Sequence, residues 1–343
     1  MVCFLLGILL SVSATNTLEI ASFDFDTTGS TVGWNGTLGK IYTVMITDDL
    51  MSNSWQTAAN GTNANCQSIV TAAEDGELEY IEQDGDAGTN RFYKIVTDDA
   101  PAFMVLIPGG TNSGIDSDSD LGPYSLTVAS FYMDRREVTK ARWNTVYNWA
   151  ITNGYSFDNS GSGKAVNHPI QTVNWYDCVK WCNARSEMDG RTPCYNLSDW
   201  SFTTSTNGYR LPTSDEWEYA ARGGLSSKRF PWGVAITHNQ ANYDSDSSDS
   251  YDISLTRGYH PTYNDGVYPY TSPVGSFAPN DYGLYDMSGN VWEWCNTADG
   301  QYRDVRGGSW DKHADDLRCG DHGLYGDPLN NSDDDIGFRS VCH

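Results

Sequence analysis

Residues 283–294 combine large aromatic side chains with two carboxylates, and this combination could hold a cation. The stretch reads Gly-Leu-Tyr-Asp-Met-Ser-Gly-Asn-Val-Trp-Glu-Trp, in which Asp286 and Glu293 are the acidic residues. Aromatic side chains favour burial, and a buried carboxylate needs a partner because an unpaired buried charge is costly. One interpretation is a calcium site, since calcium prefers oxygen ligands. The other is a core strand in which Glu293 pairs with an arginine, and the residues alone favour this second interpretation.

Seven segments between residues 102 and 343 resemble the motifs of the formylglycine-generating-enzyme family, also called the sulfatase-modifying-factor family. They agree with that family in order and spacing, and they are residues 131–139, 173–177, 209–219, 230–233, 283–294, 306–310 and 336–339. The resemblance implies an α+β domain with the C-type-lectin-like fold. It does not settle the chemistry of the domain.

In that family two calcium ions brace the long loops, so the resemblance implies two sets of oxygen ligands in this chain. The first set is the side chain of Asn242, the carbonyl of Tyr243, Asp265 and the carbonyl of Val267. The second set is Asp286, the carbonyls of Gly289 and Val291, and Glu293. A mixture of carboxylate, amide and carbonyl oxygens is usual for calcium. The alternative for Asn242 and Asp265 is ordinary turn chemistry.

The segment after Ser309 lacks the residues that the family's oxidase uses for catalysis. That oxidase binds copper through two cysteines, the first of them three residues beyond a Gly-Gly-Ser sequence. In this chain Lys312 stands at that position, and the next cysteine, Cys319, matches a structural cysteine of the family. Thiolates are soft ligands suited to copper(I). We therefore expect no copper and no catalytic residue, while an oxidase, a related iron enzyme and a structural subunit remain alternatives.

Residues 311–335 are rich in small polar, acidic and aromatic side chains, which are adaptable for recognition when a rigid frame carries them. The segment also resembles the variable C-terminal region of diversity-generating-retroelement proteins, which share the lectin-like fold. We predict an unknown protein or glycan ligand here, with calcium as structural support. The candidate ligand-binding residues are Trp310, Asp311, Lys312, His313, Asp315, Asp321, His322, Tyr325, Asp327 and Asn330. The alternative is a solvated acidic loop that has no partner.

The first part of the chain is predicted to hold a signal peptide and a separate β domain. Residues 1–17 contain a short apolar run that ends in small residues, as in a secretory signal. Residues 18–97 include β-branched and aromatic runs, at 41–46 and 91–96, between Asn-Gly and Asp-Gly turns. We interpret them as a fibronectin-like β sandwich that precedes the domain at 102–343. We expect a secreted protein or one on a bacterial-type cell surface.

The charge of the chain limits its partners. The sequence has 21 basic and 45 acidic side chains, so its formal charge is −24. This charge argues against nucleic acid, whose phosphates would be repelled. After the N-terminal run no apolar stretch is long enough to cross a bilayer, so we expect no membrane insertion.

Cysteines are frequent, and an exported chain can oxidise them. The family resemblance implies a disulfide between Cys182 and Cys342. Cys178 with Cys319 is an alternative pairing, and Cys182 with Cys194 is another, because spacing cannot separate them. No Cys-x-x-Cys sequence is present, so a structural zinc site is not expected.

Three helices are predicted between residues 139 and 224. Thr139 is a candidate cap for the first helix, and Asn174 is a candidate cap for the second. Thr213 and Glu216 form a capping box at the start of the third. Beyond Gly233 short aromatic strands alternate with long polar loops.

Overall fold

The protein's structure is a computed structural model that divides into two compact units, Met1–Phe103 and Met104–His343. In the first unit it describes the backbone of seven strands, and beyond them it describes residues 103–116, 122–300, 302–325 and 331–343. For Asp299, Leu324 and Tyr325 it describes the backbone alone. The predicted signal peptide, residues 1–17, lies outside the described residues.

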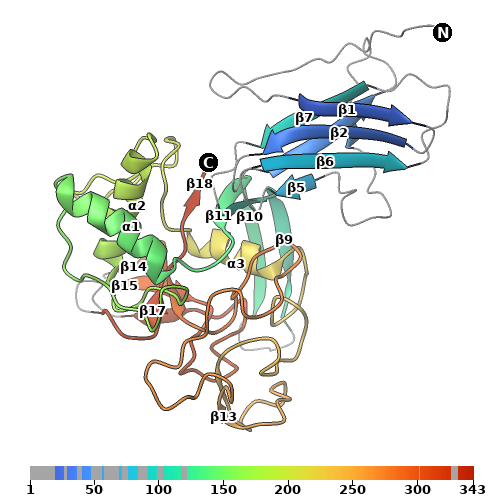
Figure 1. The fold of residues 1–343 in the computed structure, drawn as a ribbon. Helices are drawn as coiled ribbons and strands as arrows, with labels where there is room; N and C mark the ends of the chain where they lie inside the picture. Colours follow the sequence, from blue (N-terminus) through green and yellow to red (C-terminus); the bar gives the residue numbers. More distant parts are fainter. Residues whose placement is uncertain are drawn as a thin grey trace, which may run out of the picture. The chain divides into compact units, whose positions relative to one another are not determined.

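The N-terminal unit contains two antiparallel sheets (Figure 1). The first has the order β1-β2-β6, and its strands are β1 (Ile20–Asp26), β2 (Gly29–Gly36) and β6 (Gly76–Gln83). In the second, β3 (Ile41–Thr47) pairs with each of the others, which are β4 (Gln56–Thr57), β5 (Ile69–Thr71) and β7 (Phe92–Asp98). Strands β3 and β7 occupy the positions predicted at 41–46 and 91–96. Two sheets of this kind agree with the all-β domain that the turn-rich sequence predicts.

Strands from both ends of the C-terminal unit pair with each other. β11 (Phe131–Asp134) lies between β8 (Met104–Ile107) and β18 (Val341–Cys342), so the last residues join one of the first strands. A second sheet has the order β16-β15-β14-β17, and its strands are β14 (Trp292–Asp299), β15 (Tyr302–Arg306), β16 (Gly323–Tyr325) and β17 (Ile336–Gly337). Two further antiparallel pairs are β9 (Gly110–Ile115) with β10 (Pro123–Val128), and β12 (Asp244–Ser245) with β13 (Gly258–Tyr259).

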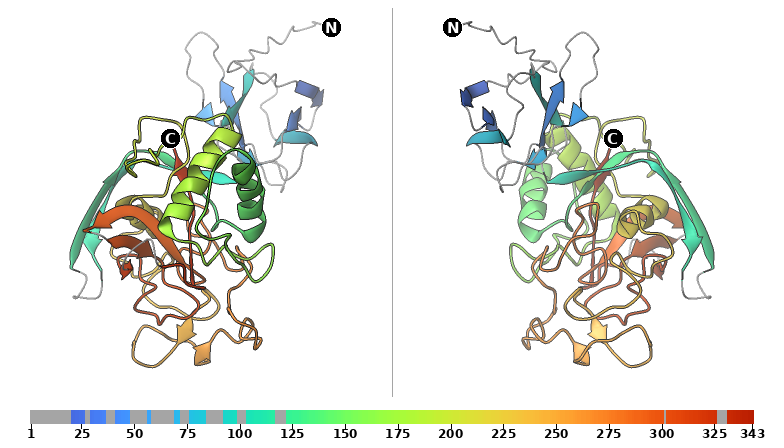
Figure 2. Two further views of the ribbon diagram at one scale, coloured as in Figure 1. Left: turned by 90° about the vertical axis from the view of Figure 1, so that its left-hand side faces the viewer. Right: turned by 90° about the vertical axis from the view of Figure 1, so that its right-hand side faces the viewer.

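Three helices of this unit begin at the caps that the sequence predicts. In α1 (Lys140–Thr152) the Thr139 side chain accepts a hydrogen bond from a first-turn amide. Capping boxes begin the other two: Asn174 with Asp177 at α2 (Trp175–Met188), and Thr213 with Glu216 at α3 (Ser214–Arg222). α1 and α2 lie side by side (Figure 2). None of the described helices has the length and apolar composition needed to cross a membrane. The predicted α+β fold class is confirmed.

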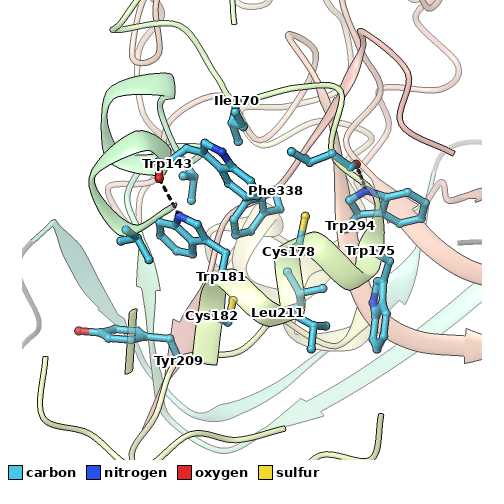
Figure 3. Packing of buried hydrophobic residues seen from close by; sticks show 14 of the residues in the cluster. Trp143, Ile170, Trp175, Cys178, Trp181, Cys182, Tyr209, Leu211, Trp294 and Phe338 are labelled. Carbon is cyan, nitrogen blue, oxygen red and sulfur yellow. Dashed lines mark hydrogen bonds between the residues drawn. The ribbon is translucent and has the colours of Figure 1, made fainter. Parts of the chain in front are cut away.

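Aromatic side chains from α1, α2 and the C-terminal part of the chain form the core between these elements (Figure 3). Trp143 of α1 stacks on Trp181 of α2 with 6.1 Å between the ring centroids, and Phe338 meets both rings edge-on. The indole nitrogen of Trp294 donates to the Val173 carbonyl at 3.1 Å, so its polar atom is satisfied inside the core. This packing holds residues 283–294 against the two helices.

The structure does not contain the predicted disulfide between Cys182 and Cys342. Both residues are buried free thiols, like the other cysteines among the described residues. The Cys342 sulfur lies 3.7 Å from the sulfur of Met104, so it packs against another side chain of the same core. Burial raises the pKa of both thiols, that of Cys342 to about 11. These sulfurs serve as small apolar groups in the core.

Asp134 joins β11, α1, α2 and the C-terminal segment through buried polar contacts. Its carboxylate accepts hydrogen bonds from Arg142 of α1 at 2.8 Å and from Arg185 of α2 at 3.0 Å. The amide and the hydroxyl of Ser340 donate to it at 3.0 and 2.6 Å. Burial opposes ionisation, but the charges of the two arginines outweigh it and hold the pKa of Asp134 below its usual value.

Replacing Asp134 by asparagine should destabilise the protein strongly. Asp134→Asn removes the negative charge that faces the guanidinium groups of Arg142 and Arg185, and breaking a buried ion pair costs about 3–5 kcal/mol. Because the fold lowers the pKa of Asp134, its stabilisation is present above the unfolded pKa and is lost as the pH falls through the folded value. Chemical denaturation at pH 7 and at acidic pH measures the free energy of unfolding.

The matched control for this variant is Asp158→Asn. The Asp158 side chain is 56% exposed and pairs with Lys180 at 3.2 Å. Exposed ion pairs contribute about 0–1 kcal/mol, so this variant should unfold at nearly the wild-type denaturant concentration. Equal losses of stability in the two variants would contradict the role assigned to Asp134.

Candidate functional site

Glu293, the second acidic residue of the aromatic motif, pairs with an arginine. Arg339 donates to both of its oxygens, from Nε to Oε2 at 2.7 Å and from Nη2 to Oε1 at 2.6 Å. The indole nitrogen of Trp217 on α3 also donates to Oε2, at 2.7 Å. All three side chains are buried. The interpretation of this motif as a core segment with an arginine partner is therefore confirmed, and Glu293 does not fit the role of a calcium ligand.

Asp286, the first residue of the second predicted calcium set, is buried with one oxygen unpaired. Its Oδ2 accepts a hydrogen bond from the Gly275 amide at 2.6 Å, while Oδ1 has no hydrogen-bond partner among the described residues. Burial raises the pKa of this carboxyl to about 6. Buried polar atoms are seldom left unpaired, so either a proton or a cation would satisfy the free oxygen.

Glu137, which is absent from the predicted ligands, is a third buried carboxylate of this region. It accepts hydrogen bonds from the side chain of Asn290 at 2.8 Å and from the Val291 amide at 3.3 Å. Burial, followed by the charges of Asp286 and Glu293, raises its pKa well above the usual value. Three carboxylates thus face the buried guanidinium of Arg339 and the more exposed one of Arg136, so negative charge is in excess. The sequence signal for Glu137 was its place in a motif segment, directly after the strand at 131–134.

The backbone around Asp286 is held in left-handed conformations. The φ angles of Asp286, Gly289 and Asn290 are 55°, 82° and 72°. A Cβ atom at Gly289 would collide with the carbonyl of Asn242, so glycine is required there. The amides of Gly289 and Asn290 donate to the carbonyls of Gly307 and Asn242 at 2.7 and 2.9 Å. These contacts fix the loop that carries the predicted carbonyl ligands.

The first predicted calcium set does not fit a cation site, because an ammonium group occupies part of it. Lys164 donates to Oδ1 of Asp265 at 2.7 Å and to the Val267 carbonyl at 3.0 Å. The Asn242 side chain donates from Nδ2 to the Tyr270 carbonyl at 2.8 Å, and Nε2 of His238 lies 3.1 Å from the Tyr243 carbonyl. Within the described ranges, no three His, Cys, Asp or Glu side chains gather in a way that could hold a metal ion.

The predicted ligand-binding residues are divided between the surface and the interior. Exposed members are Asp311, His313, Asp315 and His322, while Lys312 and Asp321 are half-buried. Trp310 is only 2% exposed, so its place in the interior corrects the prediction that it meets a ligand directly. The side chain of Tyr325, and Asp327 and Asn330 entirely, lie outside the described residues.

The start of this segment is fixed to the domain by short polar contacts. Ser309 donates from its hydroxyl to Oδ2 of Asp335 at 2.8 Å, and the Lys312 ammonium lies 3.7 Å from the same oxygen. The Trp310 amide donates to the Asn290 carbonyl at 2.9 Å. The exposed side chains of residues 311–315 therefore extend from an anchored backbone, as recognition requires.

Three tyrosines outside the predicted segment pack around Trp310. The ring centroids of Tyr259, Tyr268 and Tyr270 lie 5.7, 5.3 and 5.4 Å from that of Trp310. These tyrosines were not predicted as site residues. The available signal was the Tyr-Pro-Tyr sequence at 268–270 within a long polar loop.

Comparison with known proteins agrees with this fold. The family model described as the sulfatase-modifying factor enzyme 1-like domain matches residues 93–343. Chaperone protein LppX of Paenibacillus barcinonensis is 32% identical over 238 residues, which cover 60% of this chain and 78% of that protein. The formylglycine-generating enzyme of Thermomonospora curvata is 36% identical over 152 residues, covering 43% of this chain and 40% of the enzyme.

Among solved structures, Treponema denticola variable protein 1 resembles this chain with a TM-score of 0.51. The two are 25% identical, and the match covers 75% of this chain and 97% of the variable protein. The same scaffold thus occurs in proteins whose names indicate an enzyme, a chaperone and a variable protein. The scaffold alone does not assign an activity.

Removing the charge of Asp286 should stabilise the protein at alkaline pH in the presence of a chelator. The folded pKa of about 6 lies above the ordinary aspartate value of 3.8. The free energy of unfolding therefore falls as the pH rises from the ordinary value through the folded one. Asp286→Asn should therefore raise the free energy of unfolding at pH 8 by up to about 3 kcal/mol, with little effect near pH 4. Urea denaturation across this range measures the effect. The control Asp265→Asn, at an exposed carboxylate, should give no such gain.

Calcium should stabilise the wild-type protein through Asp286. A ligand that binds only the folded state raises its melting temperature as the ligand concentration increases. In a calcium titration we expect a smaller rise for Asp286→Asn, and an unchanged rise for Asp265→Asn because Lys164 already occupies that position. A wild-type melting temperature that is insensitive to calcium would refute binding at Asp286.

Proposed function

Since the chain belongs to the sulfatase-modifying factor enzyme 1-like family, we propose that it is a ligand-binding member of that family without oxidase activity. The observation that carries this proposal is Lys312, which stands three residues beyond Ser309 where the copper-binding oxidase needs a cysteine. An ammonium group cannot replace a thiolate as a ligand for copper(I). The half-buried Lys312 lies beside Asp335, so it serves an electrostatic role in the loop.

The nearest cysteine, Cys319, does not compensate for this replacement. Its side chain is buried in an apolar cluster with Trp217 and Leu284. Burial raises the pKa of its thiol to about 12, whereas metal binding and redox chemistry use the thiolate. The remaining cysteines of the described ranges are buried as well. The residues thus favour recognition over cysteine-based oxidation.

Recognition is supported by exposed polar side chains on an anchored backbone. Asp311, His313 and Asp315 are exposed, and the contacts of Ser309 and Trp310 hold their loop. In our proposal, a protein or glycan binds at this segment and at neighbouring loops, and calcium at Asp286 is structural support. The N-terminal apolar run supports secretion or display on the cell surface.

The purified chain should not convert a peptide cysteine to an aldehyde. Supplied with copper(I), oxygen and a cysteine-containing peptide, it should leave the peptide unchanged, because Lys312 stands where the first copper-binding cysteine is needed. Mass spectrometry of the peptide and an aldehyde-reactive probe measure the product. The Thermomonospora curvata formylglycine-generating enzyme, assayed in parallel, is the positive control. Formation of the aldehyde by the chain would overturn the proposal.

Binding is measured separately, on a glycan array and with a peptide display library. The triple variant Asp311→Ala, His313→Ala, Asp315→Ala should lose most of the selected binding while its melting temperature stays unchanged. The control Asp158→Ala also removes an exposed carboxylate, and it should bind like the wild type. Ligands that bind the triple variant and the wild type equally would place recognition elsewhere on the chain.

A further inference from the structure

Four aromatic side chains form a continuous cluster, which we call the tyrosine platform: Tyr259, Tyr268, Tyr270 and Trp310. Tyr270 contacts Tyr259 and Tyr268 at centroid distances of 5.0 and 4.4 Å, and all three tyrosines contact Trp310. Tyr259 ends β13, which lies far from α1 and α2 within the C-terminal unit (Figure 2). The platform therefore joins the long loop at 260–270 to the start of the predicted binding segment.

The platform is buried at its base and exposed at Tyr268. Trp310 and Tyr270 are 2% and 8% exposed, and the Tyr270 carbonyl accepts a hydrogen bond from the buried Asn242 at 2.8 Å. Tyr268 is 57% exposed, and its neighbour Val267 is 60% exposed. Exposed aromatic and aliphatic groups on a buried base are characteristic of binding sites, because little conformational freedom is lost when a partner docks.

Exposed carboxylates lie beside the platform. Tyr259 donates from its hydroxyl to the exposed Asp311 at 2.9 Å, which holds this carboxylate beside the rings. Asp333 and Asp334 are also exposed, and burial together with the charges of Asp311 and Asp333 raises the pKa of Asp334. The neighbouring Lys312 lies beside the buried Asp335 at 3.7 Å. Negative charge is therefore in excess around Asp311.

The protein's own Lys164 shows that these rings accept an ammonium group. Its nitrogen lies 5.8 Å from the centroid of the Tyr270 ring, while it also bonds to Asp265 and to the Val267 carbonyl. An ammonium within about 6 Å of an aromatic centroid is attracted by the negative face of the ring. One side of the platform is thus satisfied by a cation of the chain, and Tyr268 and Asp311 remain available on the solvent side.

We propose that the tyrosine platform and Asp311 bind a lysine or arginine side chain of a basic peptide segment. This inference rests on the proposed ligand-binding function and names the chemical class of the ligand. A peptide uses both features of the surface, since its cation meets Tyr268 and Asp311 while its backbone covers the exposed Val267. A neutral sugar can stack on a ring and donate hydroxyl hydrogen bonds to the carboxylates, but it brings no positive charge to balance them. The formal charge of −24 also favours encounter with a basic partner.

The test is fluorescence anisotropy of a labelled oligolysine peptide with the full chain. We expect saturable binding that weakens at high salt, and no binding of an oligoglutamate peptide. Tyr268→Ala should weaken oligolysine binding about 2- to 30-fold, as expected for the loss of a cation–π contact. Asp311→Asn should weaken it as well, while Tyr268→Phe, which keeps the ring, should bind nearly like the wild type.

Tyr302→Ala and Asp158→Asn are the matched controls, because Tyr302 is 38% exposed on β15 and the Asp158 side chain is 56% exposed. Both should bind oligolysine like the wild type. The inference is overturned if oligolysine does not bind, if Tyr268→Ala binds unchanged, or if both controls weaken binding equally. Competition by free spermidine as strong as by unlabelled oligolysine would overturn a peptide ligand. Glycan-array binding that depends on Tyr268 would show that the ligand of the platform is a sugar and not a peptide.

The experiments separate a failure of the tyrosine platform from a failure of the proposed ligand-binding function. If peptides or glycans bind through His313 and Asp315 but not through Tyr268, only the tyrosine platform is refuted. If the chain produces an aldehyde from a cysteine peptide, the ligand-binding function itself is refuted. Melting temperatures of the variants establish that each one is folded before its binding is compared.

Discussion

The C-terminal unit depends on one buried ionic contact, between Glu293 of β14 and Arg339 of the C-terminal segment. The guanidinium binds both oxygens of the carboxylate, and it also donates to the carbonyl of Tyr285 at 2.9 Å. The indole nitrogen of Trp217 donates to the same carboxylate, and this contact ties α3 to it. A bidentate pair of this kind fixes the distance and the plane of its partners. A strand, a helix, the aromatic motif and the last residues of the chain are thereby held at a single point.

Because Arg339 pairs with Glu293, the excess negative charge of this region lies on Glu137 and Asp286. Burial, together with the neighbouring carboxylates, raises the pKa values of Glu137 and Asp286, and Arg339, which already binds Glu293, offsets this only in part. A buried carboxylate in excess takes up either a proton or a cation. The cation that the family resemblance implies is therefore compatible with Asp286, although Glu293 has another role. The same excess explains why Oδ1 of Asp286 can lie buried without a partner from the protein.

Local signals made much of the fold predictable, whereas the site depends on contacts between distant residues. A capping box such as Thr213 with Glu216 spans four residues, so the sequence shows it directly. The motifs indicated the lectin-like fold, and the chemistry of residues 283–294 anticipated an arginine partner without identifying it. Lys164 lies 101 residues before Asp265, and no local pattern connects them. Trp310 was included among the candidate ligand-binding residues, because its neighbours in the sequence do not reveal that Tyr259, Tyr268 and Tyr270 surround it.

Two lysines occupy positions at which the family resemblance implies metal ions, so ammonium groups replace metals at these two places in the scaffold. Lys164 binds two of the four oxygen ligands implied for the first calcium ion, and Lys312 replaces the first copper thiolate. An ammonium group attached to the chain cannot dissociate as a metal ion does, and it carries no redox chemistry. It can still brace loops against carboxylates and carbonyls. The positive charges near the tyrosine platform are therefore bound within the fold, and the exposed carboxylates such as Asp311 remain to select a partner of opposite charge.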